Sequence, residues 1–140
     1  ELLALVDEDT EAFNKVMDAF RLPKKSEEEK AKQQLAVEDA TKYAAHVPFK
    51  TMQKSLEVLK RIAVVAEKGN ANSISDAGVA ALLAHSCSEG AAMNVLINLK
   101  SLSSKESKKF SAKMNRDVEK ILEESKSLKQ KIMRKVNGKM

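Results

Sequence analysis

The chain of 140 residues is poor in several residue types, and each shortage excludes a class of protein. It contains one cysteine, so an internal disulfide framework is impossible and the reducing cytoplasm is the expected location. No secretory signal and no uninterrupted apolar run of membrane-spanning length is readable, so no membrane association is expected. Aromatic residues make up 4% and do not alternate with basic ones, which argues against a surface that stacks nucleic-acid bases.

Turn-forming residues are scarce as well, with 4 glycines and 2 prolines. The long segments without them carry apolar residues at helical spacing and show no alternation of period two. The composition, with 43% apolar residues, therefore predicts an all-α fold, a bundle of about five helices. Two Ser–Glu pairs, Ser26–Glu29 and Ser103–Glu106, have the spacing of capping boxes, and Pro48 is expected to interrupt or kink a helix. The expected helices cover residues 1–20, 26–47, 49–68, 77–99 and 104–136.

The stretch from Gly69 to Lys100 is expected to organise the bundle. Gly69 is predicted to end one helix in a left-handed conformation, and Ser73 or Ser75 to cap the next. Between Ala77 and Leu99 the only charged residue is Glu89. Because a helix that is apolar all round is buried all round, this segment is predicted to be a long, buried central helix.

Asp9 is the most informative carboxylate, because it alone interrupts the apolar stripe of the first helix. A carboxyl group beside apolar side chains gives up its proton less readily than one in water, which suits an acid or base that works near neutral pH. The alternative is a polar layer in which a neighbouring helix satisfies Asp9, and periodicity alone favours that alternative. The stripe is formed by Leu2, Leu5, Val6, Phe13, Val16, Met17 and Phe20.

Three polar residues on the predicted central helix are candidate binding positions, because polar groups on a buried helix need partners: Asp76, Asn94 and Asn98. Asp76 and Asn94 are separated by about 27 Å of helix, so one chain cannot bring both to the same small ligand. In an antiparallel homodimer the Asp76 end of one chain could meet the Asn94 end of its mate. No second ligand stands at chelating spacing around His46, and no metal site is expected.

The charge is unevenly distributed. Residues 100–140 carry 13 basic and 5 acidic residues, whereas residues 1–99 carry 12 and 15. A basic last helix can attract an anionic ligand, but a solvated helix face is the simpler interpretation. Nucleic-acid binding is the weakest alternative, and a non-catalytic helical dimerisation module is a further one.

Five sequence blocks occur in an order that resembles one enzyme family. The chain is similar to the formiminotetrahydrofolate cyclodeaminase / methenyltetrahydrofolate cyclohydrolase family over essentially its whole length, and the Asn-Val-Leu-Ile-Asn-Leu block is the most specific part. Residues 1–140 are therefore expected to form a single helical cyclodeaminase-like domain. Members of this family begin with a Gly-rich segment that is not seen before Glu1, so the domain is expected to be incomplete at its N-terminus. The blocks are Leu5–Phe13, Arg21–Lys24, Val47–Pro48, Gly69–Asp76 and Asn94–Lys100.

The resemblance implies a helical domain that packs as a homodimer or higher oligomer and binds a tetrahydrofolate derivative near the subunit interface. It implies a folate-dependent lyase that closes 5-formimidoyltetrahydrofolate to 5,10-methenyltetrahydrofolate with loss of ammonia. Asp9 falls where the family has its acid/base aspartate, and this agreement reverses the preference stated above. Asp76, Asn94 and Asn98 are expected near the folate, and no cofactor beyond the tetrahydrofolate substrate is expected. The second possibility is a methenyltetrahydrofolate cyclohydrolase that uses the same site.

Overall fold

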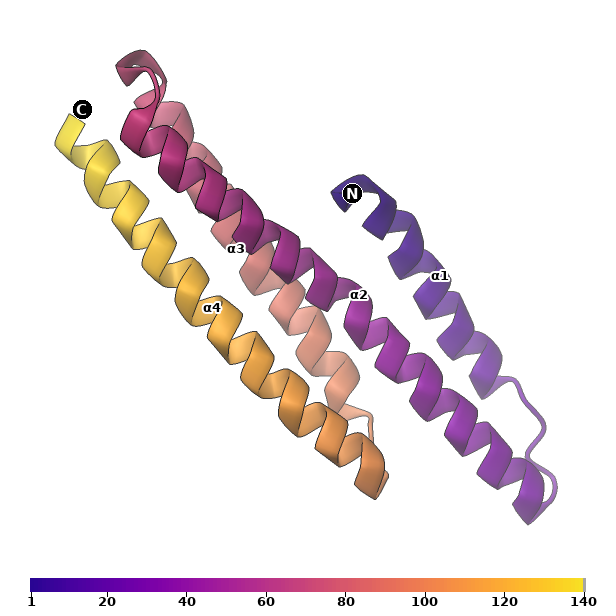
Figure 1. Ribbon diagram of the computed structural model, residues 1–140. Coiled ribbons are helices and arrows are strands. Elements are labelled where there is room, and N and C mark those ends of the chain that lie inside the picture. Colours follow the sequence, from indigo (N-terminus) through magenta and orange to yellow (C-terminus); the bar gives the residue numbers. More distant parts are fainter. Residues whose placement is uncertain (140) are drawn as a thin grey trace.

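The computed structural model describes residues 1–139 as four α-helices and one short 3₁₀ helix (Figure 1). No strand occurs among these residues, which confirms the all-α prediction, but the expected count of about five helices is wrong by one. Within the same residues, no helix is long and apolar enough to cross a membrane. The elements are α1 (Leu2–Phe20), α2 (Glu27–Lys68), η1 (Ala71–Ser73), α3 (Ile74–Lys100) and α4 (Lys105–Lys139).

The helix count differs because α2 runs without a break through Pro48. Proline has no backbone N–H, so the carbonyl four residues earlier, that of Ala44, loses its intrahelical hydrogen bond. A side chain from α3 replaces it: Asn98 Nδ2 donates to the Ala44 oxygen at 3.2 Å. Both Pro48 and Ala44 are buried, and an unpaired carbonyl there would be costly. The donor on another helix therefore lets α2 continue where the sequence alone predicts an interruption.

Helix starts agree with the sequence at one place and differ at another. The Ser26–Glu29 capping box is confirmed, with the Glu29 N–H donating to Ser26 Oγ at 3.1 Å and the Ser26 N–H donating to Glu29 Oε2 at 3.2 Å. At α4 the capping hydroxyl is that of Ser104, which accepts from the Ser107 N–H at 3.1 Å. The predicted cap, Ser103, lies one residue too early, because its hydroxyl donates to a carboxylate of α2 instead.

In the turn between α2 and α3, Gly69 is needed because there is no room for a side chain. Gly69 has φ −76° and ψ 174°, an extended conformation, so the predicted left-handed cap is wrong. A Cβ at this position would stand 2.4 Å from the carbonyl oxygen of Val65, so only glycine fits. The side chain of Asn70 then accepts from the Asn72 N–H at 3.0 Å and starts η1, while Ser73 makes no side-chain cap.

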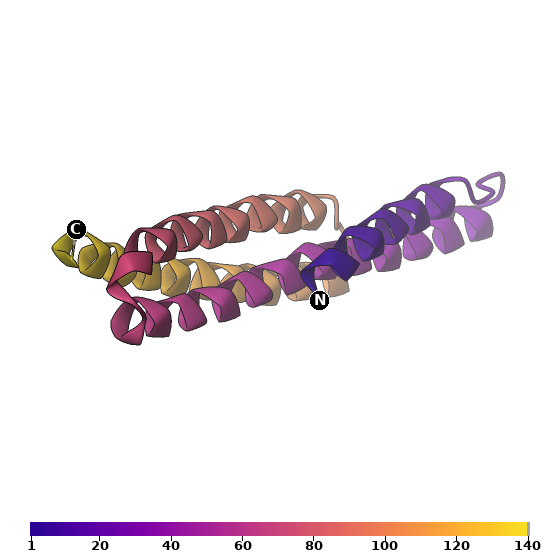
Figure 2. The ribbon, with the colours of Figure 1, turned by 90° about the horizontal axis from the view of Figure 1, so that it is seen from above.

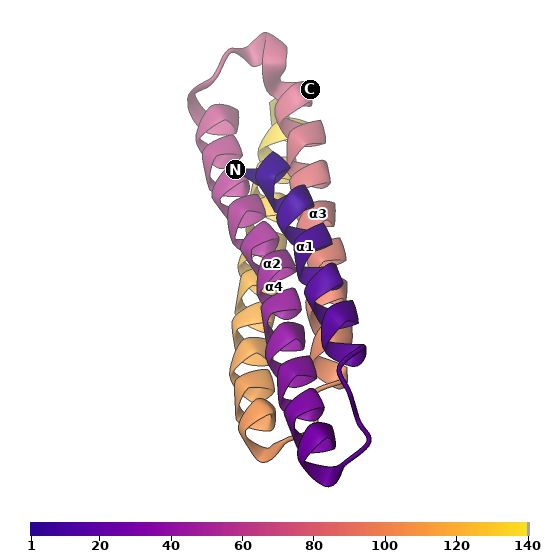
Figure 3. The ribbon, with the colours of Figure 1, turned by 90° about the vertical axis from the view of Figure 1, so that its right-hand side faces the viewer.

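The helices form an elongated, two-layered bundle in which consecutive helices run antiparallel (Figures 2 and 3). α1 and α3 lie on one side, and α2 and α4 on the other. Two apolar clusters join α2, α3 and α4, one around Met52 and Val95 and the other around Leu59 and Ile132. Gly78 lets α4 approach α3, because a Cβ there would stand 3.2 Å from Val136 Cγ1.

The structure corrects the prediction that the fourth expected helix is buried all round. In α3 one face packs against α2 and α4, and the opposite face is open to solvent in this single chain. The exposed apolar residues of α3 are Val79, Leu82, Leu83, Met93, Leu96 and Ile97.

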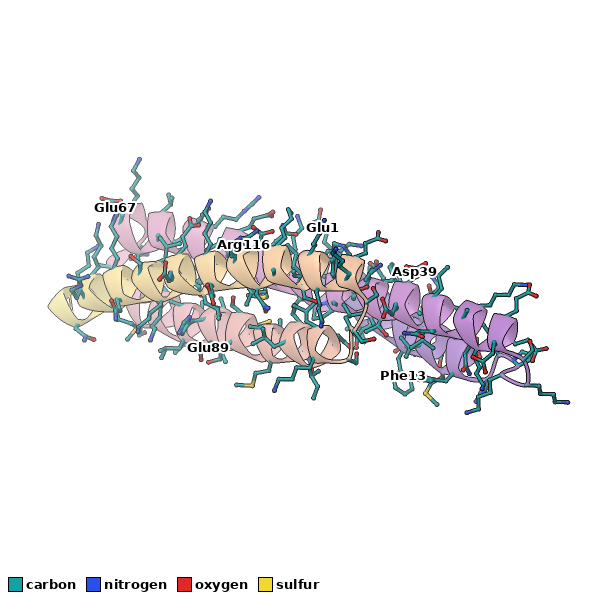
Figure 4. All side chains as sticks on the ribbon, turned by 90° about the horizontal axis from the view of Figure 1, so that it is seen from below. Glu1, Phe13, Asp39, Glu67, Glu89 and Arg116 are labelled. Carbon is teal, nitrogen blue, oxygen red and sulfur yellow. The ribbon has the colours of Figure 1, made fainter. Side chains whose placement is uncertain are left out.

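The first helix is also less buried than its apolar stripe suggests. α1 packs extensively against α2 alone, and its only buried residues are Ala12 and Ala19. Most of the stripe faces away from α2, with Phe13 61% exposed. In Figure 4, Phe13 of α1 and Glu89 of α3 lie on the same side of the molecule, away from Glu67 and Arg116. The unpartnered apolar faces of α1 and α3 therefore share one side of the bundle.

A buried carboxylate ties the start of α4 to α2. Glu38 is 6% exposed and accepts from the Ser104 N–H at 2.9 Å, from Ser103 Oγ at 3.1 Å and from Ser107 Oγ at 2.5 Å, as well as from Ser104 Oγ. These bonds, led by those from the Ser104 and Ser107 hydroxyls, lower the pKa of Glu38 to about 2. A negative charge at the N-terminus of α4 is also favoured by the helix dipole.

We predict that Glu38→Gln lowers the free energy of unfolding by roughly 1.5–3 kcal/mol, since hydrogen bonds to a buried charge are lost. The pKa of Glu38 is lower in the folded state, so its stabilisation is complete above pH ~4.5 and is lost as the pH falls toward 2. Urea denaturation across this pH range measures it. Asp39→Asn, at an exposed neighbour, is the control. Equal stability of the two variants would contradict this role.

A second prediction concerns the hydrogen bond beneath Pro48. Asn98→Ala should cost about 1 kcal/mol of unfolding free energy, because the Ala44 carbonyl loses its donor. In a Pro48→Ala background the same change should cost less, because residue 48 then supplies an N–H to Ala44. A double-mutant cycle by urea denaturation measures this coupling. Additive effects of the two substitutions would show that the compensation is absent.

Candidate functional site

A groove lies between α1 and α3, and α2 forms its floor. It has a volume of about 570 Å³. Its walls are mostly apolar, with a few polar groups among them, which is the usual composition of a small-molecule site. It is lined by Leu2, Leu5, Val6, Asp9 and Thr10 of α1, Val47, Pro48 and Thr51 of α2, and Cys87, Gly90, Ala91 and Asn94 of α3.

Asp9 faces this groove from α1. Its neighbours along the groove wall are Leu5 and Val6, one turn earlier, and its side chain is open to solvent. Among residues 1–139 no side chain or backbone group is hydrogen-bonded to its carboxylate, so the polar-layer alternative, in which a neighbouring helix satisfies Asp9, is not what this structure contains. The carboxylate is available to a molecule in the groove.

The other three predicted site residues lie in different places. Asn94 lines the groove on the α3 side, so the structure brings Asp9 and Asn94 to one cavity. Asn98 is one turn further along α3 and is not a lining residue, because its amide donates to the carbonyl oxygens of Ala44 and Asn94. Asp76 lies exposed in the first turn of α3, at the end of the bundle away from the groove.

Several lining residues were not among the predicted site residues. Thr10 and Thr51 add hydroxyl groups, and Cys87 and Gly90 stand on the same face of α3 as Asn94, at spacings of seven and four residues. The sequence spacing places these residues on one face of α3, but they become candidate lining residues only if that face is exposed. Because the helix was predicted to be buried all round, they were not selected.

The histidines lie outside the groove. His85 is buried between α3 and α4, with Nδ1 2.8 Å from Ser125 Oγ and Nε2 3.4 Å from a Glu89 oxygen. Burial lowers the pKa of His85. His46 is stacked edge-on against Phe110 on another face of α2. Among the described residues, no group of His, Cys, Asp and Glu side chains has the arrangement of a metal site.

This geometry defines a class: an all-helical protein with an apolar groove and one free carboxylate, built on a long helical platform. Comparison with known proteins gives the family. A sequence model described as formiminotransferase-cyclodeaminase matches residues 1–120. The chain therefore belongs to the formiminotransferase-cyclodeaminase family of folate one-carbon enzymes, as its sequence blocks indicate.

Individual relatives carry two activity names. The chain is 38% identical to a methenyltetrahydrofolate cyclohydrolase of Methylorubrum extorquens, across 99% of this chain and 65% of that protein. It is 34% identical to the formimidoyltransferase-cyclodeaminase of Gallus gallus, across 90% of this chain and 23% of that protein. The crystal structure of a formiminotetrahydrofolate cyclodeaminase from Thermotoga maritima superposes with a TM-score of 0.78 at 30% identity, covering 96% of this chain and 62% of that one. The chain thus spans less than two thirds of the length of these relatives.

Within a single chain Gly90 has no packing reason to be glycine, since a Cβ there would meet nothing within 4 Å. Glycine inside a helix costs stability, so its presence is consistent with keeping the groove open. We predict that Gly90→Ala raises the free energy of unfolding by about 0.5–1 kcal/mol. Gly78→Ala, where a Cβ would crowd Val136, should gain less or lose stability. Thermal or urea denaturation compares the two, and a loss of stability in Gly90→Ala would contradict the open geometry.

Proposed function

We propose that this protein closes 5-formimidoyltetrahydrofolate to 5,10-methenyltetrahydrofolate and ammonia, with the folate bound in the groove between α1 and α3. The observation that carries the proposal is the position of Asp9, a carboxylate that faces the apolar groove between α1 and α3 in a member of this family. The names of the family and of the Thermotoga maritima relative support the same reaction.

The proposed reaction needs one group that can both take and give a proton. N10 of the folate attacks the carbon of the protonated formimidoyl group on N5, so that the iminium nitrogen becomes an amino group and N10 carries a proton to lose. The amino nitrogen on the same carbon must gain a proton before the C–N bond to it breaks and ammonia departs. We assign both transfers to Asp9, which takes the proton from N10 and delivers it to the leaving nitrogen. The residue ends in its starting state, and the chemistry requires no metal or redox cofactor.

Binding is proposed to use the opposite wall and the floor. Asn94 offers an amide from α3 across the groove from Asp9, and an amide can both donate to and accept from the pterin ring. The apolar walls shield the ring from water. Asn98 supports this wall indirectly, through its bond to α2. Asp76 is too far along α3 to serve the groove of its own chain, and we propose that it faces the site of a second subunit.

A second candidate is methenyltetrahydrofolate cyclohydrolase, favoured by the name of the relative at 38% identity. In that reaction water attacks the bridging carbon of 5,10-methenyltetrahydrofolate, and Asp9 would take a proton from the water. The bond between that carbon and N5 then breaks as N5 takes up a proton and the new hydroxyl group loses its own, which leaves a formyl group on N10. Both reactions share the methenyl compound. The absorbance of the methenyl compound separates the two activities when it is followed in the native protein. A cyclodeaminase raises this absorbance when given 5-formimidoyltetrahydrofolate, and a cyclohydrolase lowers it when given 5,10-methenyltetrahydrofolate.

We predict that Asp9→Asn lowers kcat by about 10²–10⁴-fold, because the amide can neither accept nor return the proton. The variant should remain folded, since the Asp9 side chain is exposed. Asp7→Asn is the matched control: it is an exposed aspartate of the same helix that does not line the groove. Steady-state formation of the methenyl product measures the effect. Full activity of Asp9→Asn would overturn the role proposed for this residue.

We further propose that a second copy of the chain covers the exposed apolar faces of α1 and α3. The exposed face of α3 carries Leu83, Met93 and Ile97 without a charge between them other than Glu89 at its edge, and Phe13 of α1 lies on the same side of the molecule. Contiguous apolar surface over two helices is unusual in a monomer. A homodimer formed through this face would border the groove, because Gly90 and Asn94 lie on the same helix.

The homodimer predicts that Ile97→Glu shifts the protein toward monomer, because a buried unpaired charge is costly. Val64→Glu places the same charge at an exposed apolar residue of α2, outside this face, and should leave the assembly unchanged. Sedimentation velocity measures both. An unchanged oligomeric state in Ile97→Glu would exclude this face as the interface.

A further inference from the structure

A polar cluster on the opposite flank of α1 has no part in the groove. Glu8 Oε1 accepts from Lys50 Nζ at 2.5 Å and from the Tyr43 hydroxyl at 3.1 Å, so one carboxylate of α1 bonds two side chains of α2. Lys15, two turns further along α1, has its Nζ 4.4 Å from the centre of the Tyr43 ring. We call Glu8, Tyr43 and Lys50 the α1 clamp. Two further polar contacts join α1 to α2, one at each end of α1: Lys54 Nζ lies 2.9 Å from a Glu1 oxygen, and Gln33 Nε2 donates to the Phe20 carbonyl oxygen at 2.7 Å.

The remaining contact between α1 and α2 is a small apolar cluster of mostly short side chains. Its buried centre consists of Ala12, Ala44 and Val47, with Leu5 and Val16 only partly buried beside them. Because alanine and valine side chains are short, this contact restrains the rotation of α1 about its axis less than longer interlocking side chains would. No other helix packs extensively on α1. Of the polar contacts between α1 and α2, the clamp is the one beside Asp9, and it restrains the rotation of α1 at that point.

Glu8 of the α1 clamp and Asp9, the proposed acid/base, are adjacent in sequence. Successive residues of an α-helix point about 100° apart. Glu8 therefore points to one flank of α1, toward Lys50, while Asp9 points to the other flank and lines the groove. Side chains extend about 5–6 Å from the helix axis, so a rotation of α1 by ~20° would move the Asp9 carboxylate by about 2 Å. Misplacement by about 1 Å can cost an enzyme roughly 10²-fold in rate.

We propose that Glu8, Lys50 and Tyr43 are positioning residues that hold Asp9 at the reacting atoms, an inference that rests on the folate chemistry proposed above. They touch neither the groove nor a molecule within it. The ion pair is well suited to this task at neutral pH: the hydrogen-bonded ammonium of Lys50 lowers the pKa of Glu8, and the carboxylate of Glu8 raises the pKa of Lys50. Both groups therefore stay charged where the enzyme works.

The experiment compares Glu8→Gln and Lys50→Met with the control Glu11→Gln. Glu11 is an exposed carboxylate of α1, and among residues 1–139 it has no hydrogen-bond partner. In the native protein we expect Glu8→Gln and Lys50→Met to lower kcat by roughly 10–100-fold, with KM changed by less than about threefold, because substrate binding is kept and the proton transfer is misaligned. Glu11→Gln should keep the kcat of the unchanged protein. Equal activity of Glu8→Gln and Glu11→Gln would overturn the proposal.

A charge-reversed pair separates positioning from a direct electrostatic effect on Asp9. Glu8→Lys combined with Lys50→Glu restores an ion pair across the same two positions but places a positive charge beside Asp9. If the clamp acts by holding α1, the double variant recovers most of the kcat that Glu8→Lys alone loses. If the negative charge of Glu8 acts directly on Asp9, the double variant stays as slow as Glu8→Lys, and the positioning role is refuted.

A readout without turnover makes the two proposals distinguishable. Hydrogen exchange of the α1 amides should be faster in Glu8→Gln than in Glu11→Gln, while exchange in α3 and α4 stays the same. If Asp9→Asn keeps full activity but α1 exchanges faster in Glu8→Gln, the function proposed for Asp9 fails and the clamp stands. If exchange in α1 is identical in the two variants, the clamp fails whatever the activity.

Discussion

The structure depends on a single backbone carbonyl that finds its hydrogen-bond donor on another helix. Pro48 leaves the Ala44 oxygen without an intrahelical partner, and the Asn98 amide of α3 supplies the missing bond at 3.2 Å. The proline can then lie within a 42-residue helix instead of ending it. The same bond ties α3 to α2 beside the floor of the groove, to which Pro48 itself contributes. One polar contact thus supports α2 where it passes through Pro48 and joins a wall of the groove to its floor.

A platform of this length has room for two helices in succession on one side. α1 lies along the first part of α2 and α3 along the second part, and the two overlap only where the N-terminal half of α1 passes the C-terminal half of α3 (Figure 1). The groove forms at this overlap because α1 and α3 each pack on α2 and hardly touch each other. α4 packs against α3 on the side away from the exposed face of α3. The N-terminus of α4 is in turn bound by the buried carboxylate of Glu38. Asp9 and Asn94 face the groove because they occupy the overlapping halves.

The sequence predicted those features of the structure that depend on residues close together in the chain. The Ser26–Glu29 cap, the helical class and the family all follow from residues close together in the chain, and the family blocks led to Asp9. Contacts between distant residues could not be predicted in this way. Nothing near Pro48 reveals that Asn98, fifty residues later, donates to its helix, so the sequence alone predicts an interruption or a kink at Pro48. The apolar α3 was predicted to be buried, because a sequence does not state whether a helix is covered by its own chain or by another.

The central claim is that a reduced folate lies between α1 and α3 with its one-carbon unit beside Asp9. The most direct test is a crystal structure of the native protein with 5-formyltetrahydrofolate, a stable analogue of the proposed substrate. We predict the ring system between Asp9 and Asn94, with an Asp9 oxygen within about 2.6–3.2 Å of N10 or of the N5 substituent, directly or through one water. A folate bound outside this groove, or one whose N5 and N10 lie beyond the reach of Asp9, would contradict the account.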